Sequence, residues 1–238
     1  MNLRISLLII ALMPLYICSQ GLILPESFND GIADAAATEM LSRLTLEEKL
    51  NEISGSGVTA FGVSILFSNA LKPVKAGGIE RFKIPATVFV DGPRGVSFVK
   101  GATAFPVTMA RGASWDTDLE YRIGEAMAEE IRAVGGNYSG AVCMNLLRHP
   151  AWGRAQETYS EDPHHLGTMA SALVAGIQKH NVQACLKHFA ANSMENNRFG
   201  GSMNMSERTL REVYLPVSYT HLRAHETKAN LVCRLLLE

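Results

Sequence analysis

The sequence has little excess charge of either sign. Its 22 lysine and arginine residues are balanced by 23 aspartate and glutamate residues, which gives a formal net charge of -1 at pH 7. Proteins that bind nucleic acids or anionic lipids usually carry a surplus of basic residues, and this chain has none. We therefore expect neither as a partner, and a small neutral ligand fits better.

Cysteine is scarce, with four in 238 residues, and no Cys or His spacing is typical of a zinc site. His164 and His165 are adjacent, so they cannot both face one metal ion from a helix. We expect no metal and no other cofactor. Cys143 and Cys185 lie in apolar, strand-like runs and are expected to be buried free thiols, although an exported chain would also permit a disulfide.

No apolar run is long enough to span a membrane, and the one at the amino terminus is flanked differently from a spanning helix. There, Arg4 precedes an apolar run at 5–17, and small or polar residues follow. This pattern is typical of a secretory signal peptide. We therefore predict a signal peptide at 1–21 and export to the periplasm or the cell exterior. A lipid anchor through Cys18 is the alternative.

The rest of the composition is that of a folded globular protein. Hydrophobic residues make up 47% of the chain and charged residues 19%, which argues against disorder. No internal repeat, low-complexity run or linker is found before residue 216.

Strand and helix patterns alternate along the chain. Short apolar runs predict strands at 86–90, 141–147 and 183–189. Helices are predicted at 30–41, after a Thr45–Glu48 capping box, after the N-caps Asp116 and Asp162, and at about 206–215. This order is typical of a parallel α/β sheet.

Polar residues stand where each predicted strand ends. Asp91 follows the first strand, Arg154 comes after the second, and Lys187 and His188 end the third, with Arg198 in the loop beyond it. The carboxyl ends of parallel strands form the edge at which ligands bind. A carboxylate can accept hydrogen bonds from neighbouring hydroxyls while Arg, Lys and His donate others, which suits a sugar.

Several long motifs in the same region carry a family resemblance. They resemble, in this order, the amino-terminal barrel of the family 3 glycoside hydrolases, especially the β-glucosidase branch, over about residues 30–216. The motifs are LTLEEKL, DGPRG, TAFP, EIRAVG, RHPAWGRAQETYSEDP, KHFAANSMENNR and RTLREVYLP. The resemblance implies a β-glycoside or oligosaccharide substrate.

The resemblance also implies roles for individual residues. Asp91 would accept hydroxyls of the sugar in the subsite where cleavage occurs, and Arg154, Lys187, His188 and Arg198 would donate to others. The neighbouring polar residues are interpreted as structural: Arg148 and Glu195 as supports of their loops, Glu161 and Asp162 as favourable charges at a helix start, and Trp152 as packing under its loop, with stacking on a sugar face as its alternative.

The catalytic carboxylates are expected outside this sequence. Members of the family retain the anomeric configuration by using an Asp nucleophile and a carboxylic acid that protonates the leaving oxygen. The resemblance places the nucleophile on a later barrel strand and the acid/base in a second domain. We therefore predict that 22–216 is an α/β domain, roughly the first half of a TIM-type (β/α)8 barrel truncated before its later strands. As given, it should be inactive.

The last segment, 217–238, does not resemble the family. It is similar to a translated sequencing adapter, and we interpret it as a non-native tail. The alternative is a genuine amphipathic helix that uses Leu222, Leu231, Leu235 and Leu236.

Two other functions stay open. The chain could be a non-catalytic carbohydrate-binding half-barrel, or a lyase that forms a Schiff base on Lys187 at a strand end. The second requires Lys187 to be the only cation in an apolar pocket. Gluco- and xylo-configured sugars stay open as alternatives, as do the aglycone and the oligomeric state.

Overall fold

A computed structural model of the chain describes residues 30–54, 73–97 and 99–217. The predicted signal peptide and Cys18 lie outside these residues, as do 218–238 of the predicted tail. Val217, which is described, extends the last helix and is buried against the core.

One sheet of four strands organises the described residues, in the order β1-β2-β3-β4. β2, β3 and β4 are parallel, which confirms the three predicted strands, whereas β1 pairs with β2 in the antiparallel sense and was not predicted. The strands are β1 (Val74–Ala76), β2 (Thr87–Val90), β3 (Tyr138–Cys143) and β4 (Gln183–Lys187).

β3 begins and ends three or four residues before its predicted range of 141–147. Tyr138 pairs with both Phe89 of β2 and Gln183 of β4, so pairing on two sides draws its backbone into the sheet despite the adjacent Ser139 and Gly140. Pairing ends at Cys143, and the chain then turns away.

All five predicted helices are present, and within the described residues one short helix, α5, is additional. The helices are α2 (Asp30–Arg43), α3 (Leu46–Glu52), α5 (Thr108–Gly112), α6 (Thr117–Ala133), α7 (Pro163–Gln178) and α8 (Glu207–Thr209), which continues as the π-helical turn η3 (Leu210–Tyr214); the 3-10 turns are η1 (Glu80–Phe82) and η2 (Ala155–Glu157).

The predicted helix caps are confirmed. The Asp116 carboxylate accepts a hydrogen bond from the Leu119 amide at 2.8 Å, and the Asp162 carboxylate accepts one from the His165 amide at 2.7 Å. Each satisfies an amide that the first helical turn leaves without an intrahelical partner. The capping box of α3, formed by Thr45 with Glu48, is also complete.

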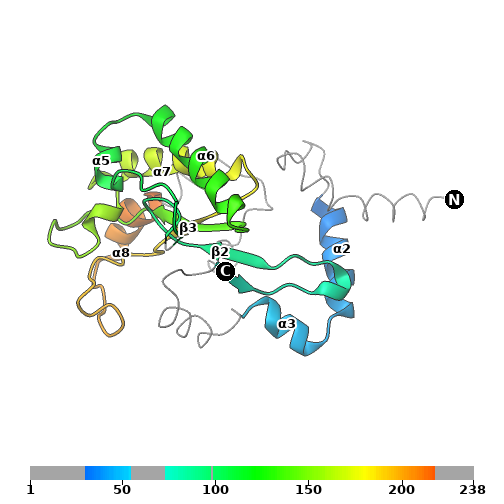
Figure 1. The fold of residues 1–238 in the computed structure, drawn as a ribbon. Coiled ribbons are helices and arrows are strands. Elements are labelled where there is room, and N and C mark those ends of the chain that lie inside the picture. Colours follow the sequence, from blue (N-terminus) through cyan, green and yellow to red (C-terminus); the bar gives the residue numbers. More distant parts are fainter. Residues whose placement is uncertain (1–29, 55–72, 98, 218–238) are drawn as a thin grey trace.

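α6 and α7 lie side by side over one face of the sheet (Figure 1). A Cβ atom at Gly124 of α6 would lie 2.5 Å from the Leu173 carbonyl oxygen, and one at Gly176 of α7 would lie 2.1 Å from the Tyr121 carbonyl oxygen. Only glycine permits this close approach of the two helices. The main hydrophobic core lies between the helix pair and β3. Fully buried members of this core include Met127, Val142, Leu166, Leu173 and Ile177.

The β1–β2 hairpin extends away from this core toward α2 and α3 (Figure 1). Glu52 of α3 accepts a hydrogen bond from the Gly78 amide at 2.6 Å, which ties the helix to the turn after β1. α3 has no buried residue, and its Leu46 and Leu50 are exposed, as is Ile53 at its carboxyl cap. Among the described residues, no helix is long and apolar enough to cross a membrane.

Candidate sugar site

An ion pair between Asp91 and Lys187 crosses the carboxyl edge of the sheet. The Lys187 Nζ lies 2.7 Å from Asp91 Oδ1, and the side chains are 16% and 45% exposed, respectively. Asp91 follows β2 and Lys187 ends β4, so the pair reaches across β3. Gly140 of β3 leaves the space, because a Cβ atom there would lie 2.9 Å from Asp91 Oδ1.

The turn after Asp91 depends on another glycine. Gly92 has φ of 134°, and a Cβ atom on it would lie 1.9 Å from the Gly95 carbonyl oxygen. Its amide donates to Asp91 Oδ1 at 2.9 Å. The DGP motif therefore turns sharply at the strand end and holds one carboxylate oxygen in place.

Arg154 lies in a second cluster at the same edge. Its guanidinium donates two hydrogen bonds to Glu157, from Nε at 2.9 Å and from Nη2 at 2.6 Å, and Nη1 lies 2.8 Å from His188 Nε2. The bond to Glu157 raises the pKa of Arg154, so it stays charged. Since His188 follows Lys187 directly, the two clusters are neighbours.

His188 is uncharged at neutral pH. Partial burial, followed by the nearby positive charges of Arg154 and Lys187, lowers its pKa to about 4. Its Nδ1 lies 2.6 Å from Asn145 Oδ1. Both ring nitrogens are thus occupied, and donation from His188 to a sugar needs a rearrangement of these contacts.

Arg198 lies at the outer rim of the site. It pairs with Glu195 at 3.2 Å, and Glu195 lies 3.7 Å from Arg154 on its other side. Glu195 also accepts a hydrogen bond from the Asn192 side chain at 3.0 Å. It therefore connects two predicted sugar contacts, in agreement with its interpretation as a residue that holds the loop.

The structure therefore brings Asp91, Arg154, Lys187 and His188 together at one edge and leaves Arg198 on the rim. Their binding of a sugar stays a prediction. Lys187 is paired with the Asp91 carboxylate, and the charged Arg154 contacts the adjacent His188, so Lys187 lacks the apolar surroundings that a Schiff-base lysine requires.

Other predicted residues have structural positions. Trp152 is 6% exposed and packs against Cys143, Ala155 and Leu147, which favours packing over stacking on a sugar. Arg148 is exposed, and its Nη1 lies 3.4 Å from the Tyr214 hydroxyl. Cys143 and Cys185 are free thiols; Cys143 is buried, but Cys185 is only partly so, because β4 lacks a described neighbour beyond it. No cluster of metal-ligating side chains occurs in the described ranges.

Two groups next to the site were not predicted from the sequence. Asn145, at the end of β3, is 4% exposed and contacts His188. Arg111 and Glu120 form a buried pair at 3.2 Å behind the site, which Tyr159 joins by donating to Glu120. The sequence held a signal for each group. Asn145 is a polar residue inside the apolar AVCMNLL run, and Glu120 is on the apolar face of a predicted helix.

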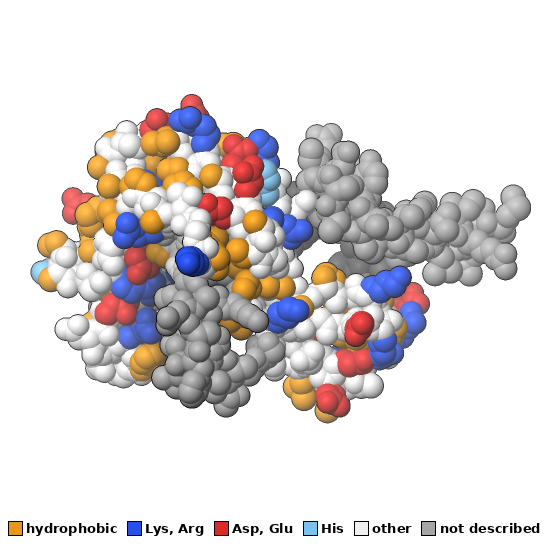
Figure 2. Space-filling model, in the orientation of Figure 1, with side chains coloured by type: hydrophobic (Ala, Val, Ile, Leu, Met, Phe, Trp, Pro, Cys, Tyr) orange, Lys and Arg blue, Asp and Glu red, His pale blue; other side chains and the backbone are white. Residues whose placement is uncertain are grey.

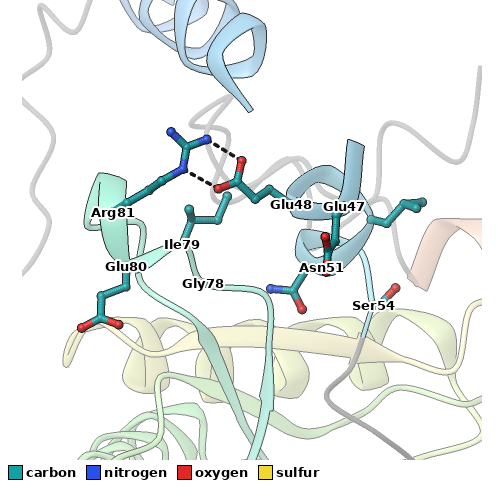
Figure 3. A pocket seen from close by; sticks show the side chains of 9 residues that line it. Glu47, Glu48, Asn51, Ser54, Gly78, Ile79, Glu80 and Arg81 are labelled. Atoms are coloured by element: carbon teal, nitrogen blue, oxygen red, sulfur yellow. Dashed lines mark hydrogen bonds and ion pairs between the residues drawn. The ribbon is translucent and has the colours of Figure 1, made fainter. Parts of the chain in front are cut away.

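A groove of about 630 Å³ lies elsewhere, between α3 and the turn at η1. Glu48 on its wall forms a bidentate ion pair with Arg81, while Glu80 points away (Figure 3). Charged side chains of both signs lie side by side over this part of the surface (Figure 2). The groove is at the turn of the hairpin, remote from the strand ends that carry Asp91 and Lys187.

Comparison with known proteins shows the family to which the sequence is similar. The profile of a family described as the glycosyl hydrolase family 3 N terminal domain matches residues 66–232. Beta-glucosidase B of Emericella nidulans is 37% identical over 186 residues, which are 76% of this chain and 20% of that protein. Thermostable beta-glucosidase B of Acetivibrio thermocellus is 35% identical, over 74% of this chain and 23% of its own length.

Solved structures are similar as well. Beta-glucosidase 3B from Thermotoga neapolitana in complex with alpha-D-glucose superimposes with a TM-score of 0.71 at 37% identity, covering 79% of this chain and 27% of that one. The beta-glucosidase D2-BGL from Chaetomella raphigera gives 0.72 at 30% identity, with 84% and 27% covered. The predicted fold class, part of a TIM-type (β/α)8 barrel, is thereby confirmed.

The chain spans only about a fifth to a quarter of the curated relatives' length. The matched range also runs past residue 216, into the segment interpreted as a non-native tail. That interpretation stays a prediction.

Proposed function

Because this chain belongs to glycosyl hydrolase family 3, we propose that it is the sugar-binding part of a β-glucosidase-like enzyme. The complete enzyme would release terminal β-linked sugars from glycosides or oligosaccharides with retention of configuration. The convergence of Asp91, Lys187, Arg154 and His188 at one strand edge is the observation that carries the proposal.

The side chains of Asp91, Lys187 and Arg154 suit the hydroxyls of one pyranose. Asp91 uses Oδ1 for Lys187, which leaves Oδ2 to accept sugar hydroxyls, and the Lys187 ammonium has further protons to donate. Arg154 is held in place by the bidentate bond to Glu157. Such fixed groups bind a sugar with little loss of side-chain entropy.

Hydrolysis needs more than this cluster. An oxocarbenium-like transition state requires a carboxylate below the anomeric carbon and a proton donor near the leaving oxygen. Asp91, Glu157 and Glu195 each form an ion pair with a cation of the site, so these carboxylates hold the neighbouring side chains in place. We therefore propose that the nucleophile and the acid/base lie in other parts of a longer protein.

Hydrolysis of an aryl β-glucoside tests both points. The 238-residue chain should give no turnover, whereas the gene extended to its natural stop should hydrolyse the substrate, and Asp91→Ala should abolish that activity. If the chain alone were active, and its own Asp91→Ala variant inactive, the catalytic carboxylates would lie within this sequence. Glucose binding by the chain, with no turnover by either form, would favour the carbohydrate-binding half-barrel.

Export is a separate proposal, supported by the Arg4 and apolar-run pattern. Mass spectrometry of protein recovered from the cell envelope should find an amino terminus close to residue 21. An intact Met1 there would contradict export by a cleaved signal peptide.

A further inference from the structure

Asn145 occupies a fixed orientation behind the predicted sugar contact His188. It follows β3, its side chain is buried, and its Oδ1 lies 3.0 Å from the backbone nitrogen of His188. Its Nδ2 lies 3.0 Å from the carbonyl oxygen of Asn192. A backbone N–H can only donate and a carbonyl oxygen can only accept, so these two partners determine which end of the amide is oxygen.

That orientation determines where the His188 proton sits. Nδ1 lies 2.6 Å from Asn145 Oδ1, an atom that can only accept, so Nδ1 must carry hydrogen. Nε2 lies 2.8 Å from Arg154 Nη1, which can only donate, so Nε2 must present its lone pair. A single state, the neutral ring with its proton on Nδ1, satisfies both contacts.

We propose that Asn145 is a positioning residue of the sugar site, which fixes the ring orientation and the Nδ1 proton of His188. His188 then acts as an acceptor, and through it Asn145 also orients Nη1 of Arg154. The inference rests on the proposed function for the identity of the ligand, but the proton placement follows from the contacts alone.

Four charged groups surround the His188 ring. Arg154 and Lys187 disfavour its protonation, and Glu157 and Glu195 favour it. Asn145 is uncharged, so replacing it with Asp adds a carboxylate at hydrogen-bonding distance without changing the size of the side chain. This change should keep the Nδ1 proton and raise the pKa of His188.

The experiment uses the 238-residue chain with ¹⁵N-labelled imidazoles, and His188→Gln identifies the resonance among the seven histidines. In the unaltered chain we expect a proton on Nδ1 and none on Nε2 at pH 7. Asn145→Asp should raise the His188 titration midpoint by at least about one pH unit. Asn145→Ala should populate both tautomers and weaken glucose binding at least about tenfold.

Asn137 supplies the matched control, because it stands before β3 as Asn145 stands after it. Its side chain accepts from the Val88 amide and donates to the Ala86 carbonyl, at the opposite end of the strand. Asn137→Asp should lower stability and leave the His188 spectrum unchanged.

The outcomes separate the two proposals. A proton on Nε2 in the unaltered chain, or an unchanged His188 titration in Asn145→Asp, would overturn the role of Asn145. Failure of the unaltered chain to bind glucose, with the expected proton on Nδ1, would overturn the proposed function instead. If Asn145→Ala does not fold, the isosteric Asn145→Asp variant still decides.

Discussion

Two ionic clusters lie near the same edge of the sheet and differ in their access to water. In the buried cluster, Arg111 and Glu120 are 2% and 1% exposed. In the open cluster, Lys187 is 16% and Asp91 45% exposed. Charges without water depend entirely on their protein partners, whereas charges that water reaches can exchange those partners for a ligand.

The buried cluster supports the open one. Arg111 Nη2 donates to the carbonyl oxygen of Pro93 at 2.8 Å, in the turn that follows Asp91. Tyr159, in the loop that carries Arg154, donates to Glu120 at 2.5 Å. Both strand-end loops are therefore attached to one buried pair, which fixes their separation.

Burial also dominates the titration of this cluster. Desolvation raises the pKa of Glu120 even though the charge of Arg111 opposes the shift, and desolvation raises the pKa of Tyr159 well above its usual value. The buried carboxylate of Glu120 therefore depends on Arg111 for the stabilisation of its charge.

The largest loss of stability is expected when Arg111 is removed. Arg111→Met should lower the free energy of unfolding by about 3–5 kcal/mol, because Glu120 is left buried without its partner. Urea denaturation of the two proteins measures the difference. The double variant with Arg111→Met and Glu120→Met should regain much of the loss, since apolar side chains of similar volume need no partner. A loss below 1 kcal/mol in the single variant would mean that water reaches the pair.

A change in the open cluster should act on binding instead. Asp91→Ala should weaken glucose binding more than about tenfold, a loss of at least about 1.4 kcal/mol, and change stability by less than about 1 kcal/mol. Calorimetric titration and urea denaturation measure the two quantities. Asp118→Ala, at an exposed position in the first turn of α6, is the control and should leave glucose binding unchanged. If the Asp91→Ala variant were unfolded at room temperature, Asp91 would be needed for the stability of the fold, as Arg111 is expected to be.

Much of this fold could be predicted because its signals are local. The caps Asp116 and Asp162 act within one turn of their helices, and the apolar run before Asp91 marks a strand, of which Val90 is buried. The convergence of the site was predictable for a further reason. Parallel strands place their carboxyl ends at one edge, so residues far apart in sequence, such as Asp91 and Lys187, become neighbours.

The rest depends on contacts that have no local signature. β1 has three residues and exists through its pairing with β2. Arg111 and Glu120 were not predicted as a pair, because only the packing of α5 against the loop with Tyr159 brings them together and removes water from them. Asn145 is a polar residue within an apolar run, but its partner His188 lies 43 positions away in the sequence.

A smaller effect is expected from His188, which is partly exposed. Its pKa is about 4 in the folded protein and about 6.5 when unfolded, so between these values the unfolded state binds the extra proton. The contribution of the neutral His188 ring to stability is fully present above pH 6.5 and is lost as the pH falls toward 4. We expect a loss on the order of 1 kcal/mol, allowing for solvent screening. His188→Gln should lose less over the same range in urea denaturation, and an equal loss would contradict the assignment.

The smallest effect is expected at the exposed end of this scale, where Glu48 pairs with Arg81 beside the groove (Figure 3). The hydrogen bond from Arg81 lowers the pKa of Glu48 to about 2, so the stability that the pair adds is present above the usual Glu value and is lost as the pH falls through 2. Glu48→Gln keeps a side chain able to complete the capping box with Thr45 but removes the charge. The unfolding midpoint should shift only slightly at low salt and not at all near 1 M salt, because water and ions already screen the pair. Glu47→Gln, at the neighbouring position of α3, controls for the loss of one carboxylate near a helix amino terminus. A salt-independent loss as large as that of Arg111→Met would show that exposure does not separate structural from exchangeable charges in this protein.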